Sequence, residues 1–382
     1  MQYRNFGKLG VEFSAFGLGC MRFPMKEVDG KRVVDEENAV SIIRAAIDGG
    51  VTYVDTAYVY SQGQNESVVG RALADGYRQR VALATKLPTW NCETAEDLPR
   101  FFAEQCAALK TDYIDFYLVH ALNRGSWDKM KALGVREFLD DLKRDGKIKY
   151  ACFSFHDDYE AFEYILNDYD WGMCQIQFNY LDVVGDRPGL RGLELAGKKN
   201  IPVVIMEGLL GGKLASVPAD VAAIFDEYKE KRTPVEWAFR WLCNFPQVAT
   251  VLSGTTDLEM TRDNLRIFDS VKVGGMSEEE LSIVERARAA YLARIRVGCT
   301  GCRYCLPCPQ GVEIPDIFAA WNDGYRFDNI SITSNEISRL EKKEKGVSRC
   351  VECGACSAVC PQSIDIPTML RAALADSQKN NG

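Results

Sequence analysis

The sequence predicts an α/β fold, a (β/α)8 barrel with an N-terminal β-hairpin, followed by a small and mainly helical domain. Three observations support this prediction: eight short runs rich in β-branched and aromatic residues, helix-like stretches between them, and two bursts of cysteine near the C-terminus. The chain has 382 residues, whereas a barrel alone needs about 250. We therefore expect a barrel domain over residues 1–275 and a second domain over residues 276–382.

The predicted barrel strands are short segments in which β-branched and aromatic side chains dominate. They cover residues 14–21, 51–57, 80–86, 113–120, 148–155, 174–179, 203–208 and 248–254. Between them, apolar residues recur about every 3.6 positions in stretches such as 36–50, 94–110 and 134–147, which predicts helices. Alternating strands and helices indicate a parallel sheet, and eight such units close most economically into a barrel. An open, doubly wound sheet is the alternative.

Each end of the barrel segment carries its own local signal. Residues 1–19 are expected to begin with a hairpin, because Gly7 and Gly10 lie near the centre of two strand-like runs. Residues 276–298 are expected to form a long helix, since Ser277 is followed three residues later by Glu280. This spacing is the capping box that begins many helices, and we place the domain boundary just before it.

The composition limits the function classes. With 47% hydrophobic and 26% charged residues, the chain can bury a large core. A net charge of -8 and the lack of a lysine or arginine run argue against nucleic acid as the main partner. The N-terminal residues do not resemble a secretory signal, and no apolar stretch approaches the roughly 18 residues of a membrane span. We expect a cytoplasmic protein without a membrane or nucleic-acid partner.

The fourteen cysteines are unevenly distributed. Eight fall in two bursts between residues 299 and 360, which in a long chain without a signal favours metal or redox chemistry over disulfides. The other six are isolated and are expected to be small buried hydrophobic residues. They are Cys20, Cys92, Cys106, Cys152, Cys174 and Cys243.

The two bursts have the spacing of iron–sulfur ligands. The first has the sequence CTGCRYCLPCP and the second CVECGACSAVCP. Three cysteines separated by two residues can hold three corners of one [4Fe-4S] cube, and a fourth cysteine before proline reaches the other cube. The near copies CPQGVEIP (308–315) and CPQSIDIP (360–367) indicate an internal repeat with two half-sites. One cluster is thus assigned Cys299, Cys302, Cys305 and Cys360, and the other Cys350, Cys353, Cys356 and Cys308.

Two structural zinc sites are the alternative. Zinc sites are built from separated C-x2-C or Cys/His pairs, however, and no histidine lies in this region. The first motif has two residues rather than three before its fourth cysteine, so the exchange of that ligand stays open. Residues 309–349 show helical patterns and no clear strand, and the module therefore resembles the α-helical type of ferredoxin domain.

The segment VDTAYVYSQGQNESVVGRAL (54–73) closely resembles the aldo-keto reductases, and the similarity spans most of residues 3–270. Asp55 ends one predicted strand, Tyr60 follows it in the next loop, and Lys86 and His120 end the next two strands. These four residues match the catalytic tetrad of the family. Because catalytic groups in such barrels lie at the C-terminal ends of the strands, we expect the four to meet at one rim.

The resemblance implies interconversion of a small-molecule carbonyl compound and its alcohol. Tyr60 would be the proton donor, and since a phenol has a pKa near 10, we expect Lys86 to lower that value. Asp55 would keep Lys86 charged, and His120 would orient the substrate oxygen. The other histidine, His156, is expected to be a loop or supporting residue near the site.

The resemblance also implies a nicotinamide dinucleotide, NADP or NAD, across the barrel mouth. Two positions differ from well-known members: Phe155 replaces an asparagine, and Met206 replaces the aromatic ring that stacks on the nicotinamide. Arg262 is the only cation expected near a 2'-phosphate, although an anion can also bind the backbone at the following helix N-terminus. The choice between NADP and NAD stays open. The implied contacts are Ser154, Gln177, Met206, Leu209, Gly211, Ser253, Gly254, Thr255, Arg262 and Asn264.

Two functions from different classes fit the sequence. The first is a nicotinamide-dependent oxidoreductase whose clusters transfer electrons or regulate it. The second is an electron-transfer protein, with a redox partner protein, in which the barrel has little carbonyl chemistry; purely structural clusters are a third possibility. A hydride carries two electrons, whereas a [4Fe-4S] cluster passes one electron at a time. A flavin would couple the two kinds of transfer, but no sequence feature demands a flavin. Trp90 and Trp127, in rim loops, are candidates for substrate contact.

Overall fold

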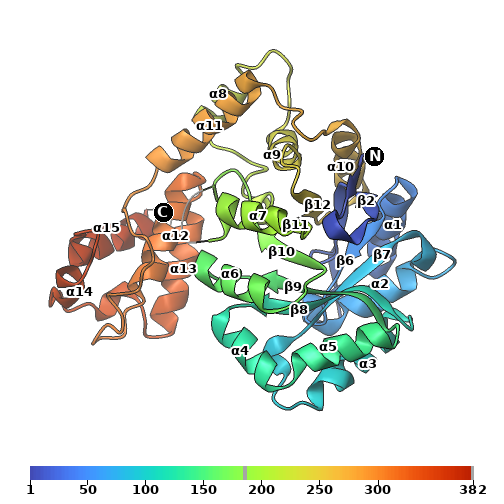
Figure 1. Ribbon diagram of the computed structural model, residues 1–382. Helices are drawn as coiled ribbons and strands as arrows, with labels where there is room; N and C mark the ends of the chain where they lie inside the picture. Colours follow the sequence, from blue (N-terminus) through green and yellow to red (C-terminus); the bar gives the residue numbers. More distant parts are fainter. Residues whose placement is uncertain (184–186, 380–382) are drawn as a thin grey trace. The chain divides into compact units, whose positions relative to one another are not determined.

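The computed structural model describes residues 1–183 and 187–379 (Figure 1). They form two compact units, Met1–Gly212 with Val235–Leu281 and Lys213–Pro234 with Ser282–Gly382. The segment after the seventh barrel strand, residues 213–234, thus groups with the C-terminal residues. The domain boundary after residue 275 stays a prediction.

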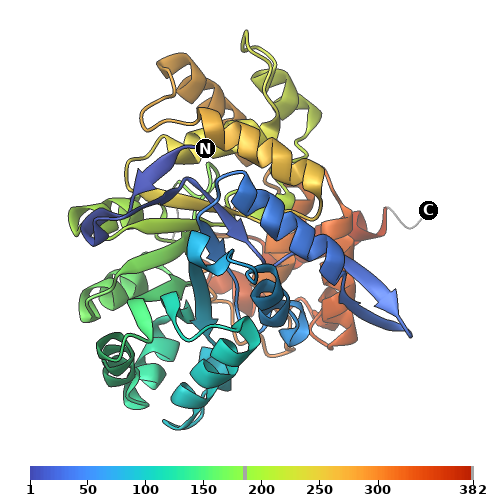
Figure 2. The ribbon, with the colours of Figure 1, turned by 90° about the vertical axis from the view of Figure 1, so that its right-hand side faces the viewer.

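Eight parallel strands of the first unit form a closed barrel in the order β10-β11-β12-β3-β6-β7-β8-β9 (Figure 2). All eight predicted strands are present. The first barrel strand pairs with the last one, with Phe16 beside Val251, so the alternative of an open sheet is wrong. The strands are β3 (Phe16–Gly19), β6 (Tyr53–Asp55), β7 (Ala82–Leu87), β8 (Ile114–Leu122), β9 (Ile148–Phe155), β10 (Met173–Gln177), β11 (Val203–Met206) and β12 (Val248–Ser253).

Amphipathic helices surround the barrel. In α1, for example, the buried residues are Ala39, Ile42, Ile43, Ala46 and Ile47, whose spacing of three and four places them on one helix face. The three stretches predicted from periodicity correspond to α1, α3 and α5. The helices of this unit are α1 (Glu36–Asp48), α2 (Asn65–Ala72), α3 (Asp97–Leu109), α4 (Arg124–Ala132), α5 (Val135–Arg144), α6 (Tyr159–Asp168), α7 (Gly189–Lys198), α9 (Pro234–Cys243) and α10 (Leu258–Ser270).

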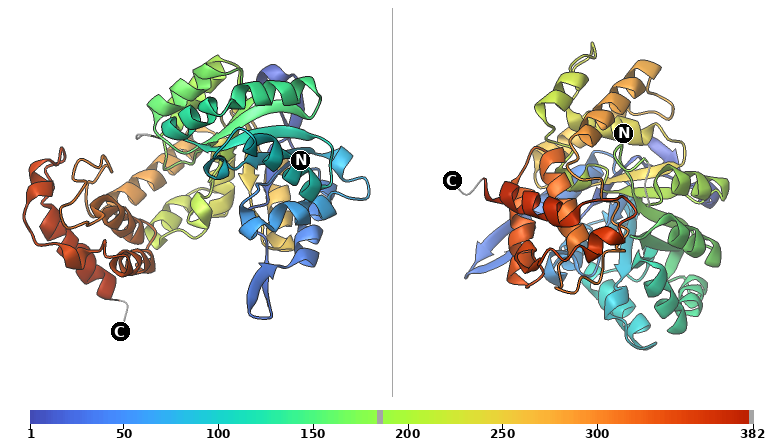
Figure 3. Two further views of the ribbon diagram at one scale, coloured as in Figure 1. Left: turned by 90° about the horizontal axis from the view of Figure 1, so that it is seen from below. Right: turned by 90° about the vertical axis from the view of Figure 1, so that its left-hand side faces the viewer.

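Two hairpins accompany the barrel. The predicted one is formed by β1 (Tyr3–Asn5) and β2 (Glu12–Ser14), which pair antiparallel. The second, β4 (Met25–Val28) and β5 (Lys31–Val34), projects from the barrel (Figures 2 and 3) and was not predicted. Its sequence signal is the Asp29-Gly30 dipeptide, whose φ angles of 50° and 72° are those of a type I′ turn.

The second unit is helical in its described residues. Its helices are α8 (Ala219–Phe225), α11 (Glu278–Ala293), α12 (Ile314–Arg326), α13 (Ser331–Lys342), α14 (Ala355–Ala358) and α15 (Ile366–Gln378), with the first turn of α11 before the unit begins. The capping box at the start of α11 is confirmed: Ser277 N donates to Glu280 Oε2 (2.6 Å) and Glu280 N to Ser277 Oγ (3.2 Å). None of the helices in the described part of the chain has the length and apolar character needed to cross a membrane.

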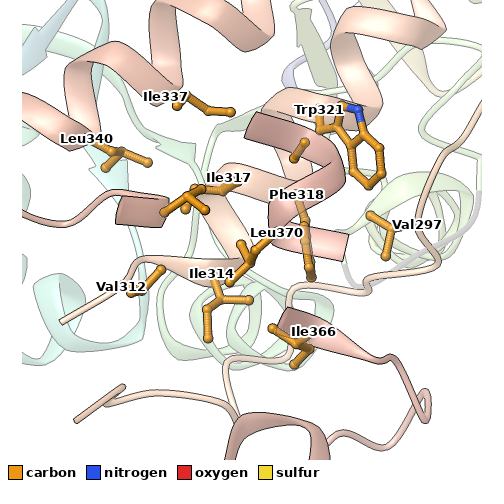
Figure 4. Close-up of a cluster of buried hydrophobic side chains, with 12 residues drawn as sticks. Val297, Val312, Ile314, Ile317, Phe318, Trp321, Ile337, Leu340, Ile366 and Leu370 are labelled. Atoms are coloured by element: carbon orange, nitrogen blue, oxygen red, sulfur yellow. The ribbon is translucent and has the colours of Figure 1, made fainter. Parts of the chain in front are cut away.

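Side chains of α12, α13 and α15 form a small core in the second unit (Figure 4). Ile317, Trp321, Leu340 and Leu370 are among its buried members, and Trp321 Nε1 donates to Asp376 Oδ2 at 3.0 Å. Six of the eight clustered cysteines pack against this core. They are Cys299, Cys305, Cys308, Cys350, Cys356 and Cys360.

Candidate functional site

The four predicted tetrad residues come together at one rim of the barrel. Asp55, Lys86 and His120 lie on the neighbouring strands β6, β7 and β8, and Tyr60 begins the 3-10 turn after β6. Lys86 Nζ donates to Asp55 Oδ1 (2.6 Å) and to the Thr56 carbonyl (2.7 Å). Lys86 Nζ lies 5.1 Å from the centre of the Tyr60 ring, and this ring lies 6.1 Å from that of His120. The parallel strands therefore assemble the set that the sequence predicts.

Lys86 is a buried cation. Its side chain is almost fully buried, and burial by itself would lower its pKa. The Asp55 carboxylate and the Tyr60 phenol together outweigh burial and raise the pKa of Lys86 above its ordinary value. The Lys86–Asp55 pair is thus an ion pair inside the barrel, as expected.

The structure corrects the expectation for Tyr60. The charge of Lys86 favours the phenolate and by itself lowers the pKa of Tyr60. Burial of the phenol raises this pKa by more, and the charge of Asp55 adds to the rise, so the pKa of Tyr60 lies above its ordinary value. The sequence could not show this, because it reveals the neighbouring charge and not the loss of solvent. Tyr60 is a neutral phenol that carries a proton available for donation.

His120 is a neutral imidazole. Burial lowers its pKa well below the usual range, and the charges of Lys86 and His156 lower it further. His156, directly after β9, is thus an electrostatic neighbour of His120, and its supporting role stays a prediction. Nδ1 of His120 is buried and has no hydrogen-bond partner within the described residues. A neutral ring with a spare nitrogen can hydrogen-bond a substrate oxygen.

The two rim tryptophans differ in role. Trp127 is fully buried, donates from Nε1 to Asp168 Oδ2 (2.7 Å), and lies 5.2 Å from the ring of Trp171, so it belongs to the core. Trp90 is 51% exposed, and its ring centre lies 4.9 Å from that of His120. Trp90 is therefore the aromatic residue beside the site.

Three of the predicted dinucleotide contacts lie on the next strands of the same rim. Ser154 on β9 is buried, and its Oγ accepts from Ala121 N (2.8 Å), directly after His120. Gln177 on β10 donates from Nε2 to Asp182 Oδ2 (2.8 Å). Met206 ends β11, with Leu209 half-buried and Gly211 exposed in the following loop.

The loop after β12 holds the other predicted contacts. Asn264 donates from Nδ2 to Ser253 Oγ (3.0 Å), and Thr255 Oγ1 accepts from Thr261 Oγ1 (2.9 Å), so both Asn264 and Thr255 are packed into the start of α10. Gly254 and Arg262 are exposed. The side chain of Asp257 accepts from Met260 N (2.8 Å) and thereby uses one of the backbone donors that an anion would bind here.

A cation that the sequence analysis missed lies at this rim. Arg22 follows β3, and a methyl group added at Gly211 would lie 3.2 Å from Arg22 Nη2, while one added at Gly254 would lie 3.7 Å from Arg22 Cβ. Arg22 thus lies beside the loops after β11 and β12, near the predicted dinucleotide contacts Gly211 and Gly254, and the assignment of Arg262 to a 2'-phosphate stays a prediction. The sequence could have indicated Arg22, because barrel closure places the residues after the first strand beside those after the last strand.

The clustered cysteines line two separate cavities in the second unit. One is lined by Cys299, Cys302, Cys305 and Cys360, and Ile314 and Phe318 contribute apolar wall. The other is lined by Cys308, Cys350, Cys353 and Cys356, again with Ile314. The fourth cysteine of each burst therefore lies with the first three of the other.

The two cysteine loops share three backbone turns, although the second loop is one residue longer and contains the short helix α14. Equivalent residues of both have left-handed φ, although three of the six are not glycine and adopt this conformation at a cost. The pairs are Gly301 (74°) and Glu352 (55°), Arg303 (64°) and Gly354 (73°), and Gly311 (76°) and Ser363 (52°). The second cysteine is the exposed one in both loops, Cys302 and Cys353. The internal repeat is thus structural as well as sequential.

The barrel and the cysteine unit each match a known domain. The Aldo/keto reductase family model matches residues 15–288. The chain belongs to the aldo/keto reductase family. The model of a 4Fe-4S dicluster domain matches residues 298–364, so this aldo/keto reductase carries an iron–sulfur domain after its barrel.

Two relatives from Bacillus subtilis (strain 168) resemble this aldo/keto reductase. The uncharacterized oxidoreductase YqkF is 26% identical over 316 residues, which are 75% of this chain and 96% of the relative. The aldo-keto reductase YhdN is 38% identical over 128 residues, 31% of this chain and 38% of the relative. Together with the family, they identify the protein as an oxidoreductase.

Solved structures confirm the barrel fold of this aldo/keto reductase. Aldo-keto reductase AKR11C1 from Bacillus halodurans in its holo form has a TM-score of 0.62 at 24% identity, over 75% of this chain and 96% of that chain. An aldo/keto reductase from Klebsiella pneumoniae in complex with NADP and acetate has a TM-score of 0.59 at 24% identity, over 74% and 94%. One from the same organism in complex with NADPH has a TM-score of 0.58 at 23% identity, over 75% and 95%.

Proposed function

We propose that the protein interconverts a small-molecule carbonyl compound and its alcohol with a nicotinamide cofactor, and that it carries two [4Fe-4S] clusters. The observation that carries the proposal is the buried Lys86–Asp55 ion pair beside Tyr60 and a neutral His120 at the barrel rim. A reduced nicotinamide, when bound, supplies hydride to the carbonyl carbon. Tyr60, Lys86, Asp55 and His120 control proton transfer to the carbonyl oxygen.

Each of these side chains has a distinct task. Tyr60, a neutral phenol, donates its proton to the carbonyl oxygen, and in the reverse direction its phenolate takes a proton from the alcohol. Lys86 stabilises the phenolate that donation leaves behind, and Asp55 keeps Lys86 charged and in place. His120 hydrogen-bonds the substrate oxygen and orients it, which its neutral state allows without adding charge.

The rim residues fit an anionic dinucleotide. Ser154 and Gln177 lie on the two strands that follow those of the tetrad, and Arg22 brings a cation to Gly211 and Gly254, with the Glu207 carboxylate also near Gly211. Two fold neighbours from Klebsiella pneumoniae hold NADP or NADPH, which supports a nicotinamide cofactor. We propose Arg22 for the pyrophosphate and Arg262 as the candidate for a 2'-phosphate, with NADP and NAD both open.

The cysteine unit fits two clusters with crosswise ligands. Each cavity presents four thiols to one space, and the two sets share no cysteine. A [4Fe-4S] cluster, when bound, accepts or passes one electron. We propose Cys299, Cys302, Cys305 and Cys360 as ligands of the first cluster and Cys308, Cys350, Cys353 and Cys356 as ligands of the second.

Replacing Tyr60 by Phe tests the catalytic part of this proposal. The variant keeps the ring and loses the proton donor, so the rate of anaerobic NAD(P)H-dependent carbonyl reduction should fall by about 10²-fold or more. Iron and sulfide content, measured on the same samples, should match the wild type. Near-normal turnover by Tyr60→Phe would refute the role of Tyr60.

A second candidate function is electron transfer with little carbonyl reduction by the barrel. It is favoured by the exposure of one cysteine in each loop and of the neighbouring Tyr304 (68%) and Val351 (63%), where a redox partner protein could approach. Anaerobic addition of NADH or NADPH followed by electron paramagnetic resonance separates the two functions. Cluster signals that appear without a carbonyl substrate being consumed would favour electron transfer, and the optical spectrum of the protein would reveal a flavin.

A further inference from the structure

A buried polar network lies directly behind Lys86, on the outer side of β7. Thr85 precedes Lys86 in the strand and, because side chains alternate, points away from the tetrad. Thr85 Oγ1 donates to Glu66 Oε1 at 2.5 Å. Glu66 lies in the first turn of α2 and is only 3% exposed, so a carboxyl group without a bound cation is enclosed beside the catalytic lysine's strand.

Gln105, on α3, completes this network. Its Nε2 donates to Glu66 Oε1 (2.8 Å) and to the Lys86 carbonyl (3.0 Å), and it lies 3.1 Å from Thr85 Oγ1. Its Oε1 accepts from Tyr117 OH on β8 at 2.9 Å. Gln105 is fully buried, so the network joins α2, α3, β7 and β8 without solvent access to its central residue.

We propose that Glu66 is a positioning residue for Lys86, holding the end of β7 through Thr85 and Gln105 and supplying a second negative group behind the lysine. The inference rests on the proposed carbonyl reductase function. Buried networks of this kind are rigid only when fully satisfied, and here both donors converge on one carboxylate oxygen. The two donated hydrogen bonds thus favour the ionised form of Glu66.

The surroundings of Glu66 leave Lys86 as its charged neighbour. The other titratable groups facing Glu66 are Tyr58 after β6, Tyr117 on β8 and Cys106 on α3. Burial raises the pKa of all three, that of Cys106 to about 11, so they are uncharged at neutral pH. Burial also raises the pKa of Glu66 itself, against the hydrogen bonds of Thr85 and Gln105 and the charge of Lys86.

A pH profile distinguishes positioning from simple structural support. Above its pKa Glu66 carries a negative charge that Glu66→Gln lacks, whereas below it the wild type is also neutral at this position. The ratio of wild-type kcat to Glu66→Gln kcat should therefore rise with pH to about tenfold and level off once Glu66 is charged. A ratio that is constant with pH would overturn the proposal.

Two further variants serve as matched controls. Thr85→Val removes the hydrogen bonds that Thr85 makes with Glu66 and with Gln105 but keeps the carboxylate, so its kcat deficit should be smaller than that of Glu66→Gln wherever Glu66 is charged. Glu104→Gln makes the same change at the exposed neighbour of Gln105 and should match the wild type at every pH. Because Thr85→Val leaves the carboxylate in place, a kcat deficit as large as that of Glu66→Gln would also contradict the proposal.

A measurement without turnover separates this inference from the proposed function. If the wild type reduces no carbonyl compound, the proposed function fails, and the pKa of Lys86 then decides the role of Glu66. Nuclear magnetic resonance of protein labelled at the lysine Cε, with Lys86→Met for assignment, follows that pKa directly. The pKa of Lys86 should be lower in Glu66→Gln than in the wild type or in Glu104→Gln. An unchanged pKa of Lys86 would overturn the inference.

Discussion

The barrel site and the cysteine unit bring their reactive groups together in different ways. At the barrel rim, Asp55, Lys86 and His120 are distant in the sequence and are brought together by three paired strands. In the cysteine unit, three ligands of each set are separated by two residues, and a short loop with left-handed turns brings them together. The first arrangement depends on the whole barrel, and the second on local spacing and a small core.

The two regions also differ in how far their ionisable side chains are buried. The Lys86–Asp55 pair is enclosed, with 1% and 3% of its side chains exposed, so its electrostatics are set by neighbours and not by solvent. The cysteine loops leave Cys302 and Cys353 exposed and six others half-buried. We infer that the polypeptide alone holds the barrel tetrad in place, whereas the cysteine unit is completed by its clusters.

Loss of a cluster ligand should give the largest effect. Replacing Cys308 by Ala should remove about half of the iron, and it should destabilise the second unit, because the thiols pack directly on its small core. Iron and sulfide analysis and limited proteolysis under anaerobic conditions would measure both changes. The crosswise assignment requires that Cys308→Ala loses the same paramagnetic signal as Cys350→Ala.

Cys106→Ala is the control for this experiment. Cys106 is an isolated cysteine on the barrel helix α3 and should leave the iron content unchanged. The comparison of the two regions breaks down if the loss of one cluster also unfolds the barrel, which tyrosine-region circular dichroism of the variant would reveal.

Breaking the buried ion pair should give the next largest effect on stability. Lys86→Met leaves the Asp55 carboxylate buried without its cation, which should cost about 3–5 kcal/mol in the free energy of unfolding. The double variant Asp55→Asn with Lys86→Met removes both charges and should regain most of that stability, while carbonyl reduction stays lost. Urea unfolding followed by tryptophan fluorescence measures the three proteins side by side.

A failure of the double variant to recover stability would show that packing, and not charge burial, accounts for the cost. The Arg100–Glu104 pair on the exposed surface of α3 is the matched control. Removing either partner there should change stability by no more than about 1 kcal/mol, because exposed pairs are weak.

The smallest effect is expected at Trp90. Trp90→Ala removes a ring 4.9 Å from His120, and an aromatic contact of about 0.5–1.5 kcal/mol corresponds to a rise of roughly 2- to 12-fold in KM. The rise should appear with aromatic aldehydes and not with short aliphatic ones. Equal changes for both substrate classes would show that Trp90 supports the loop and does not contact substrate, and Trp90→Phe should retain aromatic binding.

Several features were predictable because they depend on local pattern. The eight strands follow from runs of β-branched residues, the tetrad from its position at strand ends, and the capping box from Ser277 and Glu280. Five of the six isolated cysteines are buried as predicted, and Cys106 is half-buried. The hairpin β4–β5 carried the Asp-Gly signal and was nevertheless missed, because its charged strands lack the alternation of a half-buried sheet.

Other features could not come from the sequence because they depend on solvent exclusion and on distant contacts. The pKa of Tyr60 rises because burial outweighs Lys86, and burial is a property of the folded barrel. The separate roles of Trp90 and Trp127 depend on which ring faces Asp168 and which faces His120. Arg22 reaches the loops after β11 and β12 only because the barrel closes.

The sequence alone indicated the chemistry that we propose for this protein: a tetrad for proton transfer on barrel strands and two sets of cysteines with the spacing of cluster ligands. Spacing along one strand or loop is a local property, so it can be inferred without tertiary contacts. Only the tertiary structure decided the protonation states at the rim and the network behind Lys86, because both depend on which groups the fold removes from water. The crosswise grouping of the fourth cysteines was assigned from the motifs, and the tertiary structure brings each of them to the first three cysteines of the other burst.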